Sequence, residues 1–498
     1  MGKRGGRVED KQTLSEYVYG NLREQILTGY LRRGEPLPSL SQLCETYHVG
    51  IRTARDVLRR LSQEDLIRTE ERKPSVVIYR RPEEEGNQVE ISAVLARRVE
   101  IGEIYETMGH IMPELFAFSV QVCGREAALE YLKGMKKDGR SALEVRWKTA
   151  STALHRLLDA SCNLLFRDVF SSLKICARVP FFLECSEAAS LSRAYRDYGN
   201  PVWIAEAVET GNPEEIRRRF RTMYRALADG GEEYLASLAA MADGTGCGTP
   251  EEEKRCFSWN AKLGRDHYYL QIARSLIDRI GTGFYRDGSF LPSEAALAAE
   301  YGVSVSTIRK ALAMLNRLGF CRTYNVKGTQ VTLFNDEATF YALKNRVHKR
   351  ETLLYLSGLQ FMTLAAGPAA KLAFSGISGT ELLRLKEKME QPLSIPLDVL
   401  IRCVIRYLPL EPYRVILQEV SDILHWGYYY SFYEGGARSA NELNNRALNA
   451  FALLEEGRRD AFAGELCGCF GHALEMVRDA MVEFGLLEAA NLVTPKPQ

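Results

Sequence analysis

A long internal repeat constrains this chain more than any other feature of its sequence. When the sequence is shifted by 254 residues, residues 17–79 align with residues 271–333 without a gap, and about 20 of the 63 positions are identical. The identities include a Leu-Pro-Ser step at 37–39 and again at 291–293. Chance would give only a few identities over this length. The repeat therefore indicates a duplicated domain, and it is too long to be one unit of a solenoid.

Each copy has the sequence pattern of three helices followed by a hairpin. The first helix has apolar residues at a spacing of four, and the third has a comparable apolar face. Between them, Ser39 or Ser293 stands at the N-cap position of a short second helix, which a turn of three or four residues joins to the third. Hairpin candidates follow at 67–79 and 321–333. The apolar positions are Val18, Leu22, Ile26, Ala54, Leu58 and Leu61 in the first copy, and Ile272, Leu276, Ile280, Ile308, Leu312 and Leu315 in the second.

Two helices joined by a short turn, with a hairpin after them, form a winged helix-turn-helix. The N-terminal end of its second helix enters the major groove of DNA, where Arg can make bidentate bonds with guanine or pair with phosphate. Wing backbone amides also favour phosphate. The polar residues expected to contact DNA are Arg52, Thr53 and Arg55 in the first copy, and Ser304, Ser306, Thr307, Arg309, Lys310 and the wing residue Lys327 in the second.

The second copy resembles the DNA-binding domain of GntR-family regulators over about 65 residues. Its segment LPSEAALAAEYGVSVSTIRKALAMLNRLGF has that family's Leu-Pro-Ser-Glu step, Gly-Val-Ser turn and Thr-Ile-Arg sequence, and a wing with Gly-Thr follows. The first copy departs from the pattern. Leu40 replaces the Glu, His48 and Gly50 replace the Gly and Ser, and the segment Lys73-Pro74-Ser75 replaces the Gly-containing wing tip.

The resemblance implies which residues contact DNA. Arg55 and Arg309 match the recognition-helix Arg of the family, and Gly328 matches its wing Gly. Two further Arg residues that are common in the family are replaced here, so the resemblance does not predict the operator sequence. The other matched positions are Ser39, Ser293, Thr53 and Thr307, and the replaced positions are Ser41, Ala295, Ile51 and Val305.

Residues 90–240 and 340–487 are rich in Leu, Ala, Glu and Arg, and both segments are expected to be mostly helical. The stretch 153–163 resembles part of the helical effector domain of the FadR subgroup, in which an Asp and three His often bind a divalent metal. His155 matches one His, but Ser151 stands at the Asp position, and in the second half Arg402 follows Asp398 where a His should be. Neither half has the ligand set that tight binding needs, so no metal or other cofactor is expected.

The aromatic run 425–433 is unusual in containing Trp and several Tyr side chains. Such a run can line an apolar ligand pocket with polar tips, and it can equally belong to a core or to a dimer interface. His155, Trp426 and Tyr429 are the candidate pocket residues.

Composition excludes several classes of protein. No run of 18 or more apolar residues indicates a membrane span, and the basic N-terminus lacks the apolar stretch of a secretory signal. The 11 cysteines contain no Cys-x-x-Cys pair, which argues against a zinc site or a disulfide framework and favours a cytoplasmic protein. Formal net charge is only +1, although each repeat carries a local excess of positive charge.

The sequence thus predicts a mainly α chain: a winged helix-turn-helix at 12–82, a helical domain at 90–240, a linker at 241–266, a second winged helix-turn-helix at 267–335 and a helical domain at 340–487. The expected function is that of a GntR-type DNA-binding transcriptional regulator. The expected partners are double-stranded DNA and a small-molecule effector, with no membrane involvement. The chain would work as a homodimer or as an intrachain pseudo-dimer.

Two other classes of function are alternatives for such a chain. The modules can hold the fold yet bind protein partners, as in a scaffold protein, and the altered wing of the first copy favours this for the first half. An enzyme is not expected, because the chain has no Gly-rich phosphate loop, no Gly-x-Ser-x-Gly and no paired-histidine helix.

Overall fold

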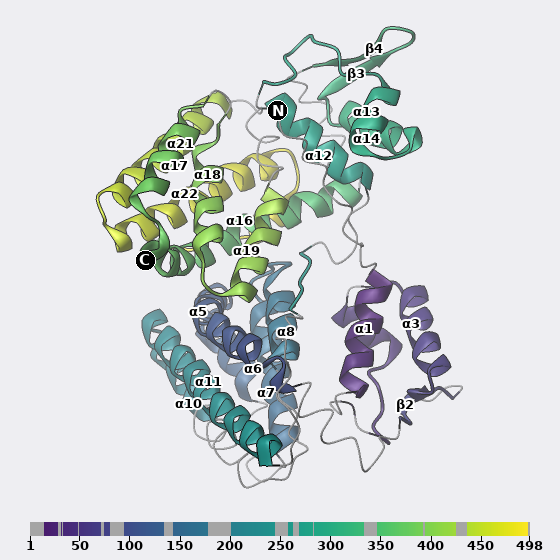
Figure 1. Cartoon of the computed structure of the whole chain (residues 1–498), viewed down its shortest axis with the longest axis vertical. Coiled ribbons are helices and arrows are strands. Elements are labelled where there is room, and N and C mark those ends of the chain that lie inside the picture. The colour runs from purple at the N-terminus through teal and green to yellow at the C-terminus, as the bar shows by residue number, and fades with distance from the viewer. Residues whose placement is uncertain are drawn as a thin grey trace.

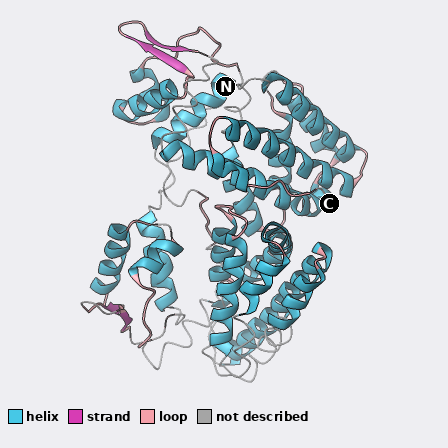
Figure 2. Ribbon diagram, turned by 180° about the vertical axis from the view of Figure 1, so that it is seen from behind, coloured by secondary structure: helices cyan, strands magenta, loops and turns pink. Residues whose placement is uncertain are grey.

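The computed structural model describes residues 14–27, 31, 33–47, 49–70, 74–79, 94–133, 143–177, 201–244, 257–261, 268–281, 283–332, 346–391, 394–424 and 436–496. Four parts follow one another along the chain, and they are named here module one, helical domain one, module two and helical domain two. Strands occur only in the two modules among these residues (Figure 2). The predicted mainly α fold class, with two winged helix-turn-helix modules, is confirmed.

Module one and module two have the same order of elements. Module one consists of α1 (Leu14–Leu27), α2 (Leu40–Thr46), α3 (Ile51–Gln63), β1 (Ile67–Arg68) and β2 (Val76–Val77). Module two consists of α12 (Tyr268–Gly281), α13 (Glu294–Tyr301), α14 (Val305–Arg317), β3 (Cys321–Tyr324) and β4 (Gly328–Val331). The apolar positions expected from the sequence are buried in both modules. Each module therefore has its own three-helix core beneath an antiparallel hairpin.

Backbone hydrogen bonds repeat at the same offset of 254 residues. Leu37 N donates to Ser75 O over 2.7 Å, and Leu291 N donates to Thr329 O over 2.8 Å. A further bridge joins Pro36 to Val76 in module one, and its counterpart in module two is also present. These bonds attach the chain before the Leu-Pro-Ser step to the hairpin. The duplication is therefore one of backbone geometry as well as of sequence.

In each helical domain the first helix packs along a long helix near the C-terminal end of the domain. Helical domain one contains α5 (Arg98–Cys123), α6 (Arg125–Lys133), α7 (Leu143–Asp159), α8 (Phe166–Cys176), α10 (Pro201–Thr210) and α11 (Pro213–Gly244). Helical domain two contains α16 (Arg346–Ala373), η3 (Phe374–Gly376), α17 (Gly379–Met389), α18 (Pro396–Tyr407), α19 (Glu411–Leu424), α21 (Gly436–Glu455), α22 (Arg459–Glu483) and η4 (Leu487–Asn491). Both first helices have an internal proline, Pro113 and Pro368. The two domains thus share one plan, with α5 along α11 and α16 along α22, although the internal repeat in the sequence covers only the modules.

The two helical domains pack against each other through α5 and α16 (Figure 1). The buried side chain of Asn163, just before α8, donates to Ser357 O over 2.9 Å and to Gln360 Oε1 over 2.8 Å, both on α16. In the other direction, Glu411 N at the start of α19 donates to Glu103 Oε2 on α5 over 3.3 Å. The first helix of each domain therefore contacts the start of a later helix of the other domain, α16 that of α8 and α5 that of α19. The contacts of α8 with α16 and of α19 with α5 are thus reciprocal between the two helical domains.

The modules differ in their connection to the helical domains. The core of module two is continuous with the core of both helical domains, and Arg274 on α12 pairs with Glu351 on α16 over 2.8 Å. The core of module one is a separate apolar cluster. Figure 1 shows both modules on the same side of the paired helical domains. Module two thus packs against helical domain two through a shared core and an ion pair, whereas module one has a core of its own.

Among the residues that the structure describes, one helix, Lys349–Gly376, is long and apolar enough to cross a bilayer. Most of its apolar window, 78%, is buried inside the protein, as in the central helix of a helical domain. By itself this helix is weak evidence for a membrane.

Candidate nucleic-acid interface

In module two, α14 has one buried face and one polar face. Ile308, Ala311, Leu312, Met314 and Leu315 are buried against the module core. On the opposite side of the helix, Ser306, Arg309 and Lys310 are exposed to solvent. Burial of the apolar face fixes the rotation of the helix. The polar side chains predicted to contact DNA therefore face outward.

Three hydroxyl groups organise the N-terminus of α14. Ser304 is the N-cap residue, and its side chain accepts a hydrogen bond from Thr307 N over 3.3 Å. Its Oγ also lies 2.8 Å from Ser306 Oγ and 2.9 Å from Thr307 Oγ1. The cap satisfies one of the backbone N–H groups at the helix start. The remaining N–H groups and the helix dipole make this end favourable for a phosphate.

Arg309 is held by a carboxylate of the preceding helix. Its Nε donates to Glu294 Oε2 over 2.7 Å, and the Arg309 side chain is 67% exposed. This ion pair uses Nε, so both Nη groups can donate to a base edge or a phosphate. Glu294 itself follows Ser293, whose hydroxyl caps α13 by accepting from Ala296 N over 3.2 Å. The Leu-Pro-Ser-Glu step thus caps one helix and orients the arginine of the next.

The wing of module two presents cations and one apolar side chain. Lys327 and Gly328 lie at the end of the hairpin and are exposed, as is Arg322 on β3. Gly328 has φ +100°, a conformation that only glycine adopts without strain. Val326, also at the tip, is fully exposed. The wing Gly predicted from the resemblance thus lies where the hairpin turns.

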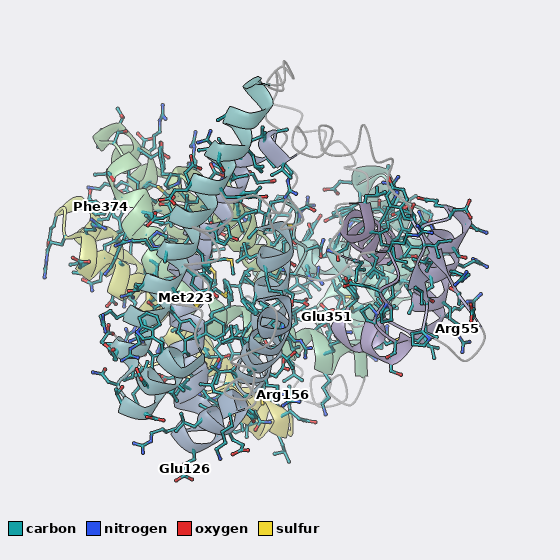
Figure 3. The ribbon with its side chains drawn as sticks, turned by 90° about the horizontal axis from the view of Figure 1, so that it is seen from below. Arg55, Glu126, Arg156, Met223, Glu351 and Phe374 are labelled. Carbon is teal, nitrogen blue, oxygen red and sulfur yellow. The ribbon has the colours of Figure 1, made fainter. Side chains whose placement is uncertain are left out.

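Module one presents its recognition helix, α3, with fewer supporting groups. Arg52 and Arg55 are exposed, and Thr53 is half-buried. Figure 3 shows Arg55 at the outer edge of the module, away from the helical domains. The N-cap residue is Gly50, which has no side chain to cap the helix. Leu40 stands where module two has Glu294, so α2 offers no carboxylate to Arg55 at this position.

The rest of the module one site is only partly described. Ser39 is exposed directly before α2, and its backbone carbonyl accepts from Leu43 N over 2.8 Å. The hairpin is short, with two residues in each strand, and Thr69 Oγ1 lies 3.0 Å from Ser75 Oγ. Lys73 of the predicted wing tip lies outside the described residues.

His155, the candidate pocket residue, lies inside helical domain one. Its Nε2 is 2.9 Å from Ser171 Oγ, and its Nδ1 is 3.4 Å from Ser151 Oγ. Burial, aided by nearby Lys174, lowers the pKa of His155 to about 3, so the ring is neutral at physiological pH. Lys174 Nζ also donates to Ser151 Oγ. Both ring nitrogens thus have hydroxyl neighbours, and a lysine occupies the adjacent space.

No group of three or more metal-ligating side chains occurs among the described residues. In helical domain two, Asp398 forms an ion pair with Arg402 over 2.7 Å, at the positions where the resemblance places an Asp and a His. Trp426 and Tyr429 lie outside the described residues, together with the rest of the aromatic run.

Two contacts of the structure, one in module two and one between the helical domains, were not predicted from the sequence. The Glu294–Arg309 pair joins residues 15 positions apart on different helices, and the Glu of the Leu-Pro-Ser-Glu step was the available signal. The contact of Asn163 with Ser357 and Gln360 joins residues almost 200 positions apart. Isolated Asn, Ser and Gln residues give no sequence pattern from which such a contact could be found.

Two cores with an outward-facing arginine helix and a hairpin wing define the class of winged helix-turn-helix proteins. The family model described as "Bacterial regulatory proteins, gntR family" matches this chain twice, at residues 14–77 and 268–331. The chain therefore carries two GntR-family winged helix-turn-helix domains.

Similar proteins carry the names of transcriptional regulators. The HTH-type transcriptional regulator SmoD of Agrobacterium fabrum is 34% identical over 74 residues, which are 15% of this chain and 32% of that protein. The mannosyl-D-glycerate transport/metabolism system repressor MngR of Escherichia coli is 36% identical over 69 residues, 14% of this chain and 29% of that protein. These matches span about a third of the relatives' length, as expected for one module.

One similar protein matches this chain over a segment much longer than one module. The uncharacterized HTH-type transcriptional regulator YdhC of Bacillus subtilis is 22% identical over 223 residues, which are 43% of this chain and 93% of that protein. Among solved structures, Streptococcus agalactiae GntR has 18% identity and a TM-score of 0.20, covering 42% of this chain and 99% of that one. The identification of the two GntR-family domains depends on the sequence matches.

Proposed function

We propose that this chain is a DNA-binding transcriptional regulator of the GntR type, in which α3 and α14 each enter a major groove. The observation that carries the proposal is the exposed arginine on each recognition helix, Arg55 and Arg309, opposite a buried leucine face. Arg309 and its hydroxyl neighbours would contact base edges, and Lys327 and the wing amides would contact the backbone. Such a regulator acts in the cytoplasm, where its DNA lies.

The helical domains have a proposed role in holding the two modules together. Their reciprocal contact through α5 and α16 supports an intrachain pseudo-dimer, which would present two recognition helices without a second chain. They are also the proposed site for a small-molecule effector. A ligand there changes DNA affinity only if it binds two arrangements of the modules unequally.

The test is a titration of the full chain against a labelled duplex from its own upstream region, at about 50 mM and about 200 mM salt. A protein that makes six or more phosphate contacts loses roughly 10³-fold or more in affinity over this range. The double variant Arg55→Ala with Arg309→Ala should abolish specific binding. Arg156→Ala removes an exposed arginine from α7 of helical domain one and serves as the matched control.

The outcome also separates the alternative function. If the wild-type chain binds this DNA no better than a scrambled duplex, and the double variant behaves identically, the DNA-binding proposal is wrong. The modules would then serve protein partners, the function that the altered wing of module one favours.

A further inference from the structure

We propose that one chain recognises a directional DNA site made of two unlike half-sites in a fixed order. This inference depends on the proposed function and adds the class of DNA that it requires. A symmetric homodimer places identical residues on both half-sites, so its operator is a palindrome. Here the reciprocal contact lies within one chain, and the two modules that it pairs are different in sequence.

The difference between the modules lies on the face that would meet the bases. At the second position of the recognition helix, module one has Arg52 and module two has Ser306, and both are exposed. Arg at this position can donate two hydrogen bonds to guanine, at O6 and N7. A serine hydroxyl can instead form a hydrogen bond with any of several bases. The two modules therefore prefer different bases at equivalent positions of their half-sites.

At a second pair of equivalent positions, the two modules carry side chains of opposite charge. Asp56 of module one corresponds to the exposed Lys310 of module two, and Asp56 pairs with Arg59 over 2.6 Å. A carboxylate beside the major groove accepts from cytosine N4 and repels phosphate, whereas an ammonium attracts phosphate and guanine. The first position of the helix is apolar in both modules, with Ile51 exposed and Val305 half-buried.

What the two faces share is small. Thr53 and Thr307 are equivalent, as are Arg55 and Arg309, and even this arginine is held by Glu294 in module two alone. The two half-sites would thus share the base that the equivalent arginines contact and differ at their other positions. The unequal attachment of the modules points the same way, because only module two shares its core with the helical domains.

The test is selection of duplexes from a random library by the full chain, followed by mass measurement of the complex on the selected site. The enriched motif should contain two unlike halves in constant order and spacing, and one chain should occupy each duplex. Arg55→Ala should relax the base preference of one half, and Arg309→Ala that of the other, whereas Arg156→Ala leaves the motif unchanged.

A substitution that makes the faces alike provides the sharpest test. In the double variant Arg52→Ser with Asp56→Lys, module one acquires the residues of module two at both positions. Its affinity for the wild-type site should fall about tenfold, as for loss of one bidentate contact. A repeated selection should yield a motif whose halves are more similar. Both positions lie on the solvent-facing side of α3, and circular dichroism would verify that the variant is folded.

Each outcome bears on a different statement. A perfect inverted repeat bound by two chains, or a motif that the double variant leaves unchanged, overturns the directional site while leaving the regulator proposal intact. Enrichment of no sequence by the wild-type chain overturns the regulator proposal itself, and with it this inference.

Discussion

Module one and module two place different residues on the same backbone. The second residue after the recognition helix adopts a left-handed conformation in both, with φ +54° at Asp65 and φ +82° at Gly319. At the other end of the helix, Gly50 and Ser304 have nearly equal dihedral angles, φ −71° and −70°. The leucines beneath the helix are retained. The comparison shows that duplication preserved the scaffold, while the caps and the DNA-facing side chains changed.

The same comparison separates stability from recognition. Module two has Ser304 as the cap of its recognition helix, Gly319 at the left-handed position after this helix and Glu294 beside Arg309. Module one has none of these at the equivalent positions. Module two also shares a continuous core with the helical domains, whereas module one is stabilised by its own apolar cluster. We therefore expect module two to be the more rigid of the two and module one to unfold independently.

The largest expected effects come from the leucines that support the two recognition helices. Leu61→Ala and Leu315→Ala each remove a side chain that is fully buried, which costs about 2–5 kcal/mol. All four tryptophans lie outside the modules, at 147, 203, 259 and 426. Leu315→Ala should shift denaturation followed by tryptophan fluorescence, because its core continues into the helical domains.

Leu61→Ala should instead shift a transition seen by far-ultraviolet circular dichroism and leave the fluorescence transition in place. If both variants shift the fluorescence transition equally, the two modules are coupled to the helical domains alike, and the contrast between them is wrong.

The next largest effect concerns DNA affinity. Arg309→Ala should weaken binding to a selected site by about 1–3 kcal/mol if the arginine contacts a base edge. Arg55→Ala should weaken binding less, because α2 places Leu40 rather than a carboxylate at the position that orients Arg309. Titrations at constant salt would measure both losses. Equal losses would show that the Glu294 contact adds nothing to recognition.

Removing the cap of module two should have a smaller effect. Ser304→Ala leaves the Thr307 N–H without its side-chain acceptor, and loss of such a cap costs about 1 kcal/mol. Ser304→Gly should cost only a few tenths of a kcal/mol, because glycine is also tolerated at an N-cap. Denaturant unfolding of the two variants would give this order, and the reverse order would refute the capping role.

The smallest effect is a gain in module one. Gly50→Ser introduces the cap that module two has, and a Cβ at Gly50 meets no atom within 4 Å. The backbone there already has extended angles that serine adopts. The free energy of unfolding of module one, followed by far-ultraviolet circular dichroism, should rise by a few tenths of a kcal/mol. No gain, or a loss, would mean that α3 begins differently from α14.

Much of the modules could be predicted from the sequence because their determinants are local. The four-residue spacing of Val18, Leu22 and Ile26 indicated the first helix, and Ser293 before a short helix indicated a cap. The structure has both features. The hairpins also lie within the predicted ranges 67–79 and 321–333.

The arrangement of the helical domains could not be predicted in the same way. Leu- and Ala-rich segments showed that they are helical, but the partner of each apolar face depends on contacts far apart in the sequence. The contact between the two domains includes single polar residues such as Asn163, just before α8, which follow no periodicity. The ligand pocket expected at the aromatic run stays a prediction, because Trp426 and Tyr429 lie outside the described residues.

The central claim is that Arg55 and Arg309 lie in major grooves of the same duplex. Dimethyl sulfate protection of guanine N7 on a selected duplex tests it most directly, because N7 faces the major groove. The account predicts two clusters of protected guanines. Arg309→Ala should restore reactivity in one cluster and Arg55→Ala in the other. An identical pattern for the wild-type chain and both variants, or no protection at all, would contradict it.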